Sequence, residues 1–140
     1  VKGRMQRKSG INGAILIDYT YNAIPDSAMA ALDVLAQFQG AKIFVLGDMG
    51  EVGPDGNAMH AAIGQYAQQS GVDRLFSLGE LSHQAATKFG NGSALYVRAE
   101  DLIANLRPLL KTGVTVLIKG SRFMHMERVV NALVSETALA

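Results

Sequence analysis

The chain has 140 residues, of which 49% are hydrophobic and 18% are charged, with a formal net charge of +1. This length suits one α/β domain and is too short for two, and the apolar content excludes a disordered chain. Acidic and basic residues are interspersed, so no nucleic-acid partner is indicated. With no cysteine, the chain has no disulfide framework or thiolate zinc site, which suits a cytoplasmic protein. No run approaches the roughly 18 apolar residues of a membrane span.

The start of the chain carries its one basic cluster, formed by Lys2, Arg4, Arg7 and Lys8. Short charged termini are usually solvated, so we interpret this cluster as a partly frayed end. The first residue is Val1 rather than Met, and we expect the chain to be a piece of a longer protein.

Apolar residues at helical spacing alternate with short β-rich runs along the whole chain. A tight turn is provided by Ser9-Gly10 or Asn12-Gly13, and Gly40 follows the first helical run. The predicted elements, in chain order, are a hairpin over Met5–Thr20 with its second strand at Ala14–Asp18, a helix over Pro25–Phe38, a strand at Lys42–Leu46, a helix over Asn57–Ser70, a strand at Arg74–Leu78, a helix over Leu81–Phe89, a strand at Leu95–Val97, a helix over Glu100–Leu110 that Pro108 would curtail, a strand at Val114–Ile118 and a helix over Phe123–Val134. This alternation predicts a single α/β domain with a doubly wound, mostly parallel sheet of about six strands and helices on both faces. The hairpin would add an antiparallel edge strand.

Two nucleotide-binding signatures are missing from the sequence, the GxGxxG fingerprint and the GxxxxGK[ST] loop. If this protein uses ATP, another segment must therefore hold most of the nucleotide. The histidines, His60, His83 and His125, have no metal-ligand spacing, so we expect no metal site on this chain.

Charged residues stand at the ends of three predicted strands, Asp18, Asp48 and Lys119. The ends of parallel strands share one edge of a sheet, so the two carboxylates and the ammonium could converge on a ligand there. Carboxylates suit ribose hydroxyls, a substrate ammonium or a metal, and a lysine suits a phosphate or carboxylate. The alternative is that each is a solvated loop residue or a helix cap.

The turn Lys119–Arg122, with the sequence KGSR, is the sharpest local signal. Gly120 would let a ligand approach the backbone, Ser121 stands at a predicted helix start that favours anions, and Arg122 can bind a carboxylate. A plain strand-to-helix turn with Ser121 as N-cap explains the same residues. His60 follows a glycine-rich loop that holds Asp48 and Glu51, and it would either bond back to that loop or face solvent.

These residues fall in the order of a known family. The motifs are Asp18 with Tyr21-Asn22-Ala23 and Pro25-Asp26-Ser27, then Gly47–Gly53 with the sequence GDMGEVG, His60, Lys119–Arg122 and Met126-Glu127. Together they resemble the C-terminal domain of the Mur ligases, over essentially the whole chain. Any one motif alone would be weak, but their order is specific.

The resemblance implies a Rossmann-like domain, residues 1–140, that is the last of three domains in an ATP-dependent ligase of peptidoglycan precursor synthesis. Such a ligase phosphorylates a peptide carboxylate with ATP and Mg²⁺, held mainly by a central domain, and an incoming amine attacks the acyl phosphate. The resemblance is greatest to members that join D-alanyl-D-alanine to a UDP-N-acetylmuramoyl-tripeptide in the cytoplasm. The partners implied are these substrates and the missing N-terminal and central domains. The fragment alone would be inactive.

The resemblance also implies site residues, none of them catalytic. Four would contact the nucleotide: Arg4, Asp18, Tyr19 and Asn22. Five would line the dipeptide pocket: Tyr21, Asn22, Lys119, Ser121 and Arg122. Asp48, Glu51 and His60 would form a neighbouring loop.

The sequence departs from the family pattern at two positions. Tyr19 stands where homologues carry an acidic residue, and Ile24 stands where they often carry asparagine. A ribose contact made by that acid would be lost here or replaced by Asp18. A receiver-like phosphoacceptor module, with Asp48 and Lys119 as its strand-end residues, is the alternative from another class. A Rossmann-like interaction domain without a ligand is a third.

Overall fold

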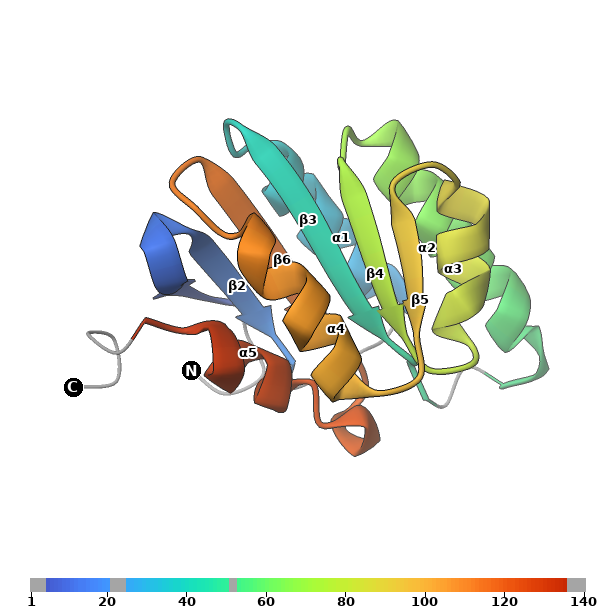
Figure 1. The fold of residues 1–140 in the computed structure, drawn as a ribbon. Coiled ribbons are helices and arrows are strands. Elements are labelled where there is room, and N and C mark those ends of the chain that lie inside the picture. The colour runs from blue at the N-terminus through green and yellow to red at the C-terminus, as the bar shows by residue number, and fades with distance from the viewer. Residues whose placement is uncertain (1–4, 21–24, 51–52, 136–140) are drawn as a thin grey trace.

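The computed structural model describes residues 5–20, 25–50 and 53–135, which form a six-stranded sheet with helices on both faces (Figure 1). The strand order is β1-β2-β6-β3-β4-β5, with β1 antiparallel to β2 and the other neighbours parallel. The strands are β1 Gln6–Ser9, β2 Ile15–Tyr19, β3 Ala41–Gly47, β4 Arg74–Leu78, β5 Ser93–Tyr96 and β6 Val114–Lys119. The predicted fold class and the antiparallel edge strand are confirmed.

Two cores lie on the two faces of the sheet. The α-helices described are α1 Pro25–Ala36, α2 Gly56–Gln69, α3 Ser82–Phe89, α4 Ala99–Leu106 and α5 Glu127–Leu133. Helices α4 and α5 cover the face toward the viewer in Figure 1, and α1, α2 and α3 pack on the other. Since side chains alternate along a strand, Leu16 of β2 joins the α4–α5 core and Ile17 joins the α1–α3 core. Successive β2 residues therefore lie on opposite faces of the sheet, and each can contact only groups on its own face.

Strand β6 lies inside the sheet between β2 and β3, and all six of its residues are buried. The chain leaves β2 and β3 toward α1 and α2 on one face, but leaves β6 toward α5 on the other. Adjacent loops that depart to opposite faces open a crevice at the carboxyl ends of the strands, where α/β proteins bind ligands. The topological switch point of this fold is therefore the end of β6.

The last predicted helix, Phe123–Val134, is divided in two. A 3-10 helix, η4 Arg122–Met124, is followed by His125 in the left-handed region (φ 51°), and α5 begins only at Glu127. The break carries Met126 into the α4–α5 core, where it is fully buried. At the other boundaries the differences are small, and β5 lies slightly earlier than predicted. As expected, α4 ends before Pro108, which lies in a short 3-10 turn, η3 Arg107–Leu109.

The interpretation of the basic cluster as a frayed end is wrong for its two described members. Arg7 and Lys8 belong to β1, and Lys8 Nζ lies 2.8 Å from Asp18 Oδ2 on β2. The Arg7 guanidinium lies over the Phe38 ring, 5.7 Å from its centroid. The other two members lie outside the described residues. Strand pairing and these contacts hold Arg7 and Lys8 in place.

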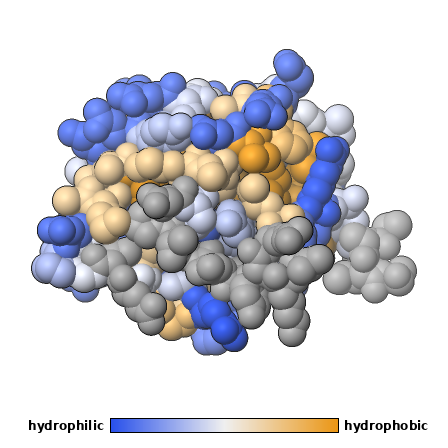
Figure 2. Space-filling model, turned by 180° about the vertical axis from the view of Figure 1, so that it is seen from behind, coloured by the Kyte–Doolittle hydropathy of each residue, from blue (hydrophilic) through white to orange (hydrophobic). Residues whose placement is uncertain are grey.

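The surface seen from behind in Figure 2 carries polar residues along its top edge, and apolar residues gather on the side where β1 and β2 lie.

Among the helices that the structure describes, none combines the length and the apolar character needed to cross a bilayer.

Candidate functional site

Tyr19 and Lys119 meet at the switch point. They are register partners at the last positions of β2 and β6, on the sheet face that α1, α2 and α3 cover. The Lys119 ammonium lies over the Tyr19 ring, 3.6 Å from its centroid, a cation–π contact. Lys119 is fully buried although it is the last residue of β6, at the carboxyl ends of the strands. A charged group is thus held at the place where this fold class binds ligands.

Burial lowers the pKa of Lys119 from its usual 10.5 to about 8. Loss of hydration disfavours the charged ammonium, while the Tyr19 ring face favours it. At neutral pH Lys119 therefore still carries its charge. Burying an ionisable group destabilises the fold. Groups buried in this way are therefore found mainly where function requires them.

Asp18 does not share this site, since it follows Leu16 on the opposite face of the sheet. Its Oδ2 accepts a bond from Lys8 Nζ at 2.8 Å. Its Oδ1 accepts bonds from the Thr20 amide at 3.2 Å and the Thr20 hydroxyl at 2.7 Å. Asp18 thus orders the end of β2, and its side chain lies on the opposite face of the sheet from Tyr19.

Asp48 holds three elements together just beyond the end of β3. Its carboxylate accepts bonds from the Leu81 amide at 3.1 Å and the Ser82 amide at 2.7 Å, which caps the start of α3. Its carbonyl oxygen accepts bonds from the amide and hydroxyl of Ser121, at 3.0 and 2.7 Å. Gly79 has φ 110°, and a Cβ there would lie 2.6 Å from the Asp48 carboxylate, so glycine is required. The expected convergence of Asp18, Asp48 and Lys119 therefore does not form: the edge is shared, but both carboxylates are engaged elsewhere.

His60 bonds back to the loop that follows β3, the first of the two expected alternatives. It is fully buried on α2, where its Nε2 accepts a bond from the Met49 amide at 3.0 Å. Its Nδ1 therefore carries the proton and donates to the Gly56 carbonyl oxygen at 2.6 Å. His60 ties the two ends of the glycine-rich loop together.

The turn after β6 is built by packing. Ser121 precedes η4, but its hydroxyl donates to Asp48 and makes no cap bond to η4. The close approach to Gly120 is made by the protein itself, because a Cβ there would lie 2.5 Å from Met126 Cγ and 3.2 Å from Gly47 Cα. The predicted anion-binding helix start is wrong, since only a 3-10 turn follows and α5 begins later. The turn is held by the Ser121 bonds to Asp48, with the exposed Arg122 next to Ser121.

Four predicted site residues lie outside the described residues: Arg4, Tyr21, Asn22 and Glu51. Within the described ranges, no group of three or more His, Asp or Glu side chains is placed to hold a metal ion. Sequence reasoning missed the contact of Tyr19 with Lys119, and it gave a helix cap only as an alternative for Asp48, without the partner helix α3. Both depend on strand order and on which way a side chain points, which no local pattern reports.

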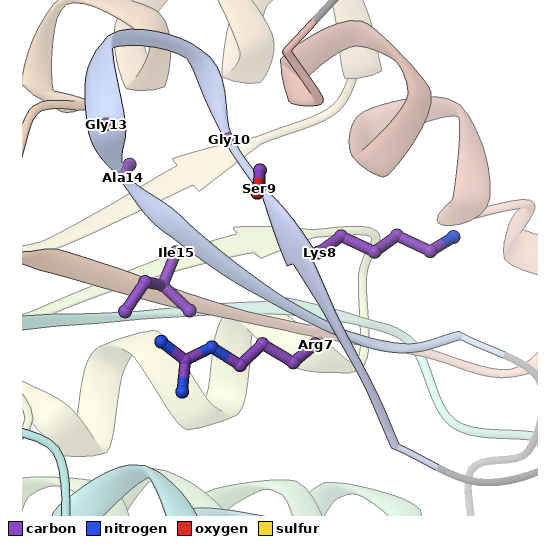
Figure 3. Close-up of a pocket in the computed structure, with 7 residues that line it drawn as sticks. All are labelled: Arg7, Lys8, Ser9, Gly10, Gly13, Ala14 and Ile15. Atoms are coloured by element: carbon purple, nitrogen blue, oxygen red, sulfur yellow. The ribbon is translucent and has the colours of Figure 1, made fainter. Parts of the chain in front are cut away.

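A separate hollow of about 420 Å³ lies at the other end of β2 (Figure 3). It is lined by Arg7, Lys8, Ser9, Gly10, Gly13, Ala14 and Ile15. Arg7 and Lys8 leave β1 in opposite directions, and Lys8 is engaged by Asp18. None of its polar side chains is buried, so we assign no ligand to this hollow.

Comparisons with known proteins agree on one family. A family model described as "Mur ligase, glutamate ligase domain" matches residues 3–122. The chain is 38% identical over 139 residues to the UDP-N-acetylmuramoyl-tripeptide–D-alanyl-D-alanine ligase of Escherichia coli K12, covering 95% of this chain and 30% of that protein. It is 30% identical over 130 residues to the enzyme of the same name from Bacillus subtilis 168, covering 88% of this chain and 28% of that protein.

Solved structures give the same result. A MurF ligase from Thermotoga maritima, crystallised with ADP, matches with a TM-score of 0.83 and 26% identity over 94% of this chain and 30% of that one. A MurF from Acinetobacter baumannii matches with a TM-score of 0.84 and 30% identity over the same shares. The chain thus spans about 30% of the length of these similar proteins.

Proposed function

Since the chain belongs to the Mur ligase family, we propose that it is the C-terminal domain of a three-domain ligase that adds D-alanyl-D-alanine to a UDP-N-acetylmuramoyl-tripeptide. The names of the E. coli and B. subtilis relatives support this reaction. The share of their length that the chain covers supports the role of one domain among several. The ligase would act in the cytoplasm, in the synthesis of peptidoglycan precursors for the cell wall.

In this reaction ATP phosphorylates the terminal carboxylate of the tripeptide, which gives an acyl phosphate and ADP. The dipeptide amine then attacks the acyl carbon, phosphate leaves, and the nitrogen loses a proton. The relative crystallised with ADP supports the use of ATP. The described residues do not fit a Mg²⁺ site, and the sequence has no phosphate-binding loop, so other domains would hold the metal and most of the nucleotide. This domain would bind and orient the dipeptide.

The buried ammonium of Lys119 at the switch point carries this proposal. A lysine kept charged at the end of a central strand can pair with the free carboxylate of the dipeptide. Ser121, fixed by Asp48, and the exposed Arg122 would form the adjacent wall of the pocket. His60 and Asp48 would keep the loop beside this pocket in place.

The remaining roles rest on the resemblance. Arg4, Tyr19 and Asn22 are proposed nucleotide contacts, and Tyr21 and Asn22 are proposed dipeptide contacts. Asp18 would contribute indirectly by ordering the end of β2 through Thr20. Glu51 would belong to the loop that His60 holds.

Asp48 does not fit the phosphoacceptor role that the receiver-like alternative requires of it. Both carboxylate oxygens of Asp48 accept amide bonds at the start of α3. A phosphoacceptor needs one of these oxygens free to attack phosphorus. The membership of the chain in the Mur ligases also disfavours a receiver-like module and an interaction domain without a ligand.

The test compares substrates in the full-length ligase. Lys119→Ala should raise KM for D-alanyl-D-alanine about 30-fold or more, because the dipeptide carboxylate loses a buried charge partner. Ser121→Ala should raise it by a smaller factor. KM for the UDP-linked tripeptide should change little in both. Lys111→Ala is the matched control, because Lys111 is exposed at the opposite end of β6. Equal losses for both substrates would contradict the proposed pocket.

A further inference from the structure

The Met126-Glu127 motif stands at the start of α5, outside the proposed pocket wall Lys119–Arg122. The Met126 side chain is fully buried in the α4–α5 core. His125 before it has φ 51°, and this left-handed residue separates η4 from α5. The motif therefore begins with a side chain that packs inside the fold, next to the turn that follows β6.

The Met126 side chain packs against two glycines at the ends of neighbouring strands. Gly47 is the last residue of β3, and Gly120 directly follows β6. A Cβ on Gly47 would lie 2.6 Å from Met126 Sδ, and a Cβ on Gly120 would lie 2.5 Å from Met126 Cγ. Neither glycine has a left-handed φ, so the nearest obstacle to a side chain at both positions is Met126 rather than the backbone conformation.

The same two strand ends carry residues of the proposed pocket and its support. Ser121 follows Gly120, Asp48 follows Gly47, and the Asp48 carbonyl oxygen accepts bonds from the Ser121 amide at 3.0 Å and hydroxyl at 2.7 Å. The thioether of Met126 has no hydrogen to donate, so it acts here through its volume. Because protein interiors are close-packed, that volume sets how closely the end of β3 and the turn after β6 approach each other.

We propose that Met126 is a positioning residue for the dipeptide: its buried side chain, packed against Gly47 and Gly120, sets the position of the turn Lys119–Arg122 that receives the substrate. This inference rests on the proposed function, because it takes that turn as a wall of the dipeptide pocket. It gives the methionine of the Met126-Glu127 motif a role that the resemblance does not supply. Met126 acts through the backbone of the turn and need not touch the substrate.

Substitutions of Met126 in the full-length ligase test this role. Met126→Ala removes volume beside both glycines and should raise KM for D-alanyl-D-alanine about tenfold, with kcat within about twofold. Met126→Leu keeps most of the volume and should raise it less than about threefold. KM values for ATP and for the UDP-linked tripeptide should change less than about twofold in both variants. Equal increases for the dipeptide and the tripeptide would indicate a general loss of structure and overturn the inference.

Leu133→Ala is the matched control. Leu133 is fully buried in the same core, at the end of α5, and the next residue, Val134, bridges to Gly10 in the connection between β1 and β2. It therefore lies toward the opposite end of β2 from the proposed pocket. Leu133→Ala should lower Tm about as much as Met126→Ala and leave KM for the dipeptide unchanged. Equal increases of this KM in the two variants overturn the inference.

Gly47→Ala tests the same contact without opening a cavity. Its methyl group would collide with Met126 Sδ, whereas the nearest other side chain, Met124, would have its Cβ at 3.4 Å, an ordinary contact distance. KM for the dipeptide should rise about tenfold, and adding Met126→Ala should lower it again at least threefold, because the collision is removed. If Met126→Ala does not fold, Gly47→Ala decides, and an unchanged KM for the dipeptide overturns the inference.

Two further outcomes distinguish this inference from the proposed function. If Lys119→Ala raises KM for the dipeptide and Met126→Ala raises it no more than Leu133→Ala does, the inference falls and the proposed function stands. If Lys119→Ala leaves KM for the dipeptide unchanged, the turn is not a wall of the pocket and both fall.

Discussion

Lys119 is a residue whose environment lowers the stability of the fold. Its ammonium is desolvated at the end of β6, and burial lowers its pKa to about 8. The cation–π contact with Tyr19 offsets part of this cost. A protein under selection for stability alone would place an apolar side chain here. Keeping the lysine is consistent with binding an anion at this position.

The stability of the 140-residue chain should therefore depend on pH through Lys119. The folded-state pKa of about 8 lies below the usual 10.5, so the unfolded chain binds more protons between these values. The free energy of unfolding should rise with pH across this window, by on the order of 1–3 kcal/mol. Lys119→Met should remove this rise and stabilise the fold at pH 7. Urea unfolding of both proteins from pH 7 to pH 10.5 measures the difference, and parallel profiles would contradict the lowered pKa.

At the scale of elements, Asp48 connects the ends of β3, β6 and the start of α3. Its carbonyl oxygen accepts both bonds from Ser121, and its carboxylate accepts the two amide bonds from Leu81 and Ser82. The turn that follows β6 is thus held by backbone and hydroxyl groups, and the helix start is held by a side chain. One residue serves both without facing a ligand itself.

Asp48→Ala should destabilise the fold by about 1–2 kcal/mol, because the start of α3 loses its cap. Hydrogen exchange should increase most at the amides of Leu81 and Ser82. Asp55→Ala is the matched control: Asp55 is exposed before α2 and makes no cap bond, so its removal should cost less than about 0.5 kcal/mol. Equal losses in the two variants would show that the Asp48 carboxylate does not act as the cap.

At the scale of the whole molecule, the chain would supply one wall of the proposed site. The described residues supply an ammonium, a turn held by the bonds from Ser121 to Asp48, and the bond between Met49 and His60 at the carboxyl ends of the central strands. They supply no metal cluster, and the sequence contains no phosphate-binding loop. The chemistry of phosphoryl transfer would therefore need the other domains of the ligase.

The 140-residue chain alone should show no ATP hydrolysis and no ligation of D-alanyl-D-alanine above the buffer blank, even with Mg²⁺. The reason is that phosphoryl transfer depends on a bound metal and a phosphate cradle, which catalyse by charge stabilisation and positioning. Phosphate release and product formation, measured beside the full-length ligase, check this. Appreciable ATP hydrolysis by the purified chain would refute the assignment of the catalytic groups to other domains.

The sequence by itself determined the order of the elements, the two-faced α/β sheet and the turn at Lys119–Arg122. Hydrophobic periodicity and glycine positions are local properties, and they are preserved when the chain folds. The family could be identified from short motifs for the same reason. The bonding of His60 to its loop was one of two readings that the local pattern left open.

Only the tertiary structure decided what the strand-end residues do. The insertion of β6 between β2 and β3 places Lys119 beside Tyr19, a neighbour a hundred residues away in the chain. Because side chains alternate along a strand, Asp18 points to the sheet face opposite Tyr19 and bonds to Lys8. The Asp48 carboxylate accepts its bonds from amides at the start of α3. Contacts between distant segments are set by the order and register of strands, which depend on the packing of the entire core rather than on any one stretch of sequence.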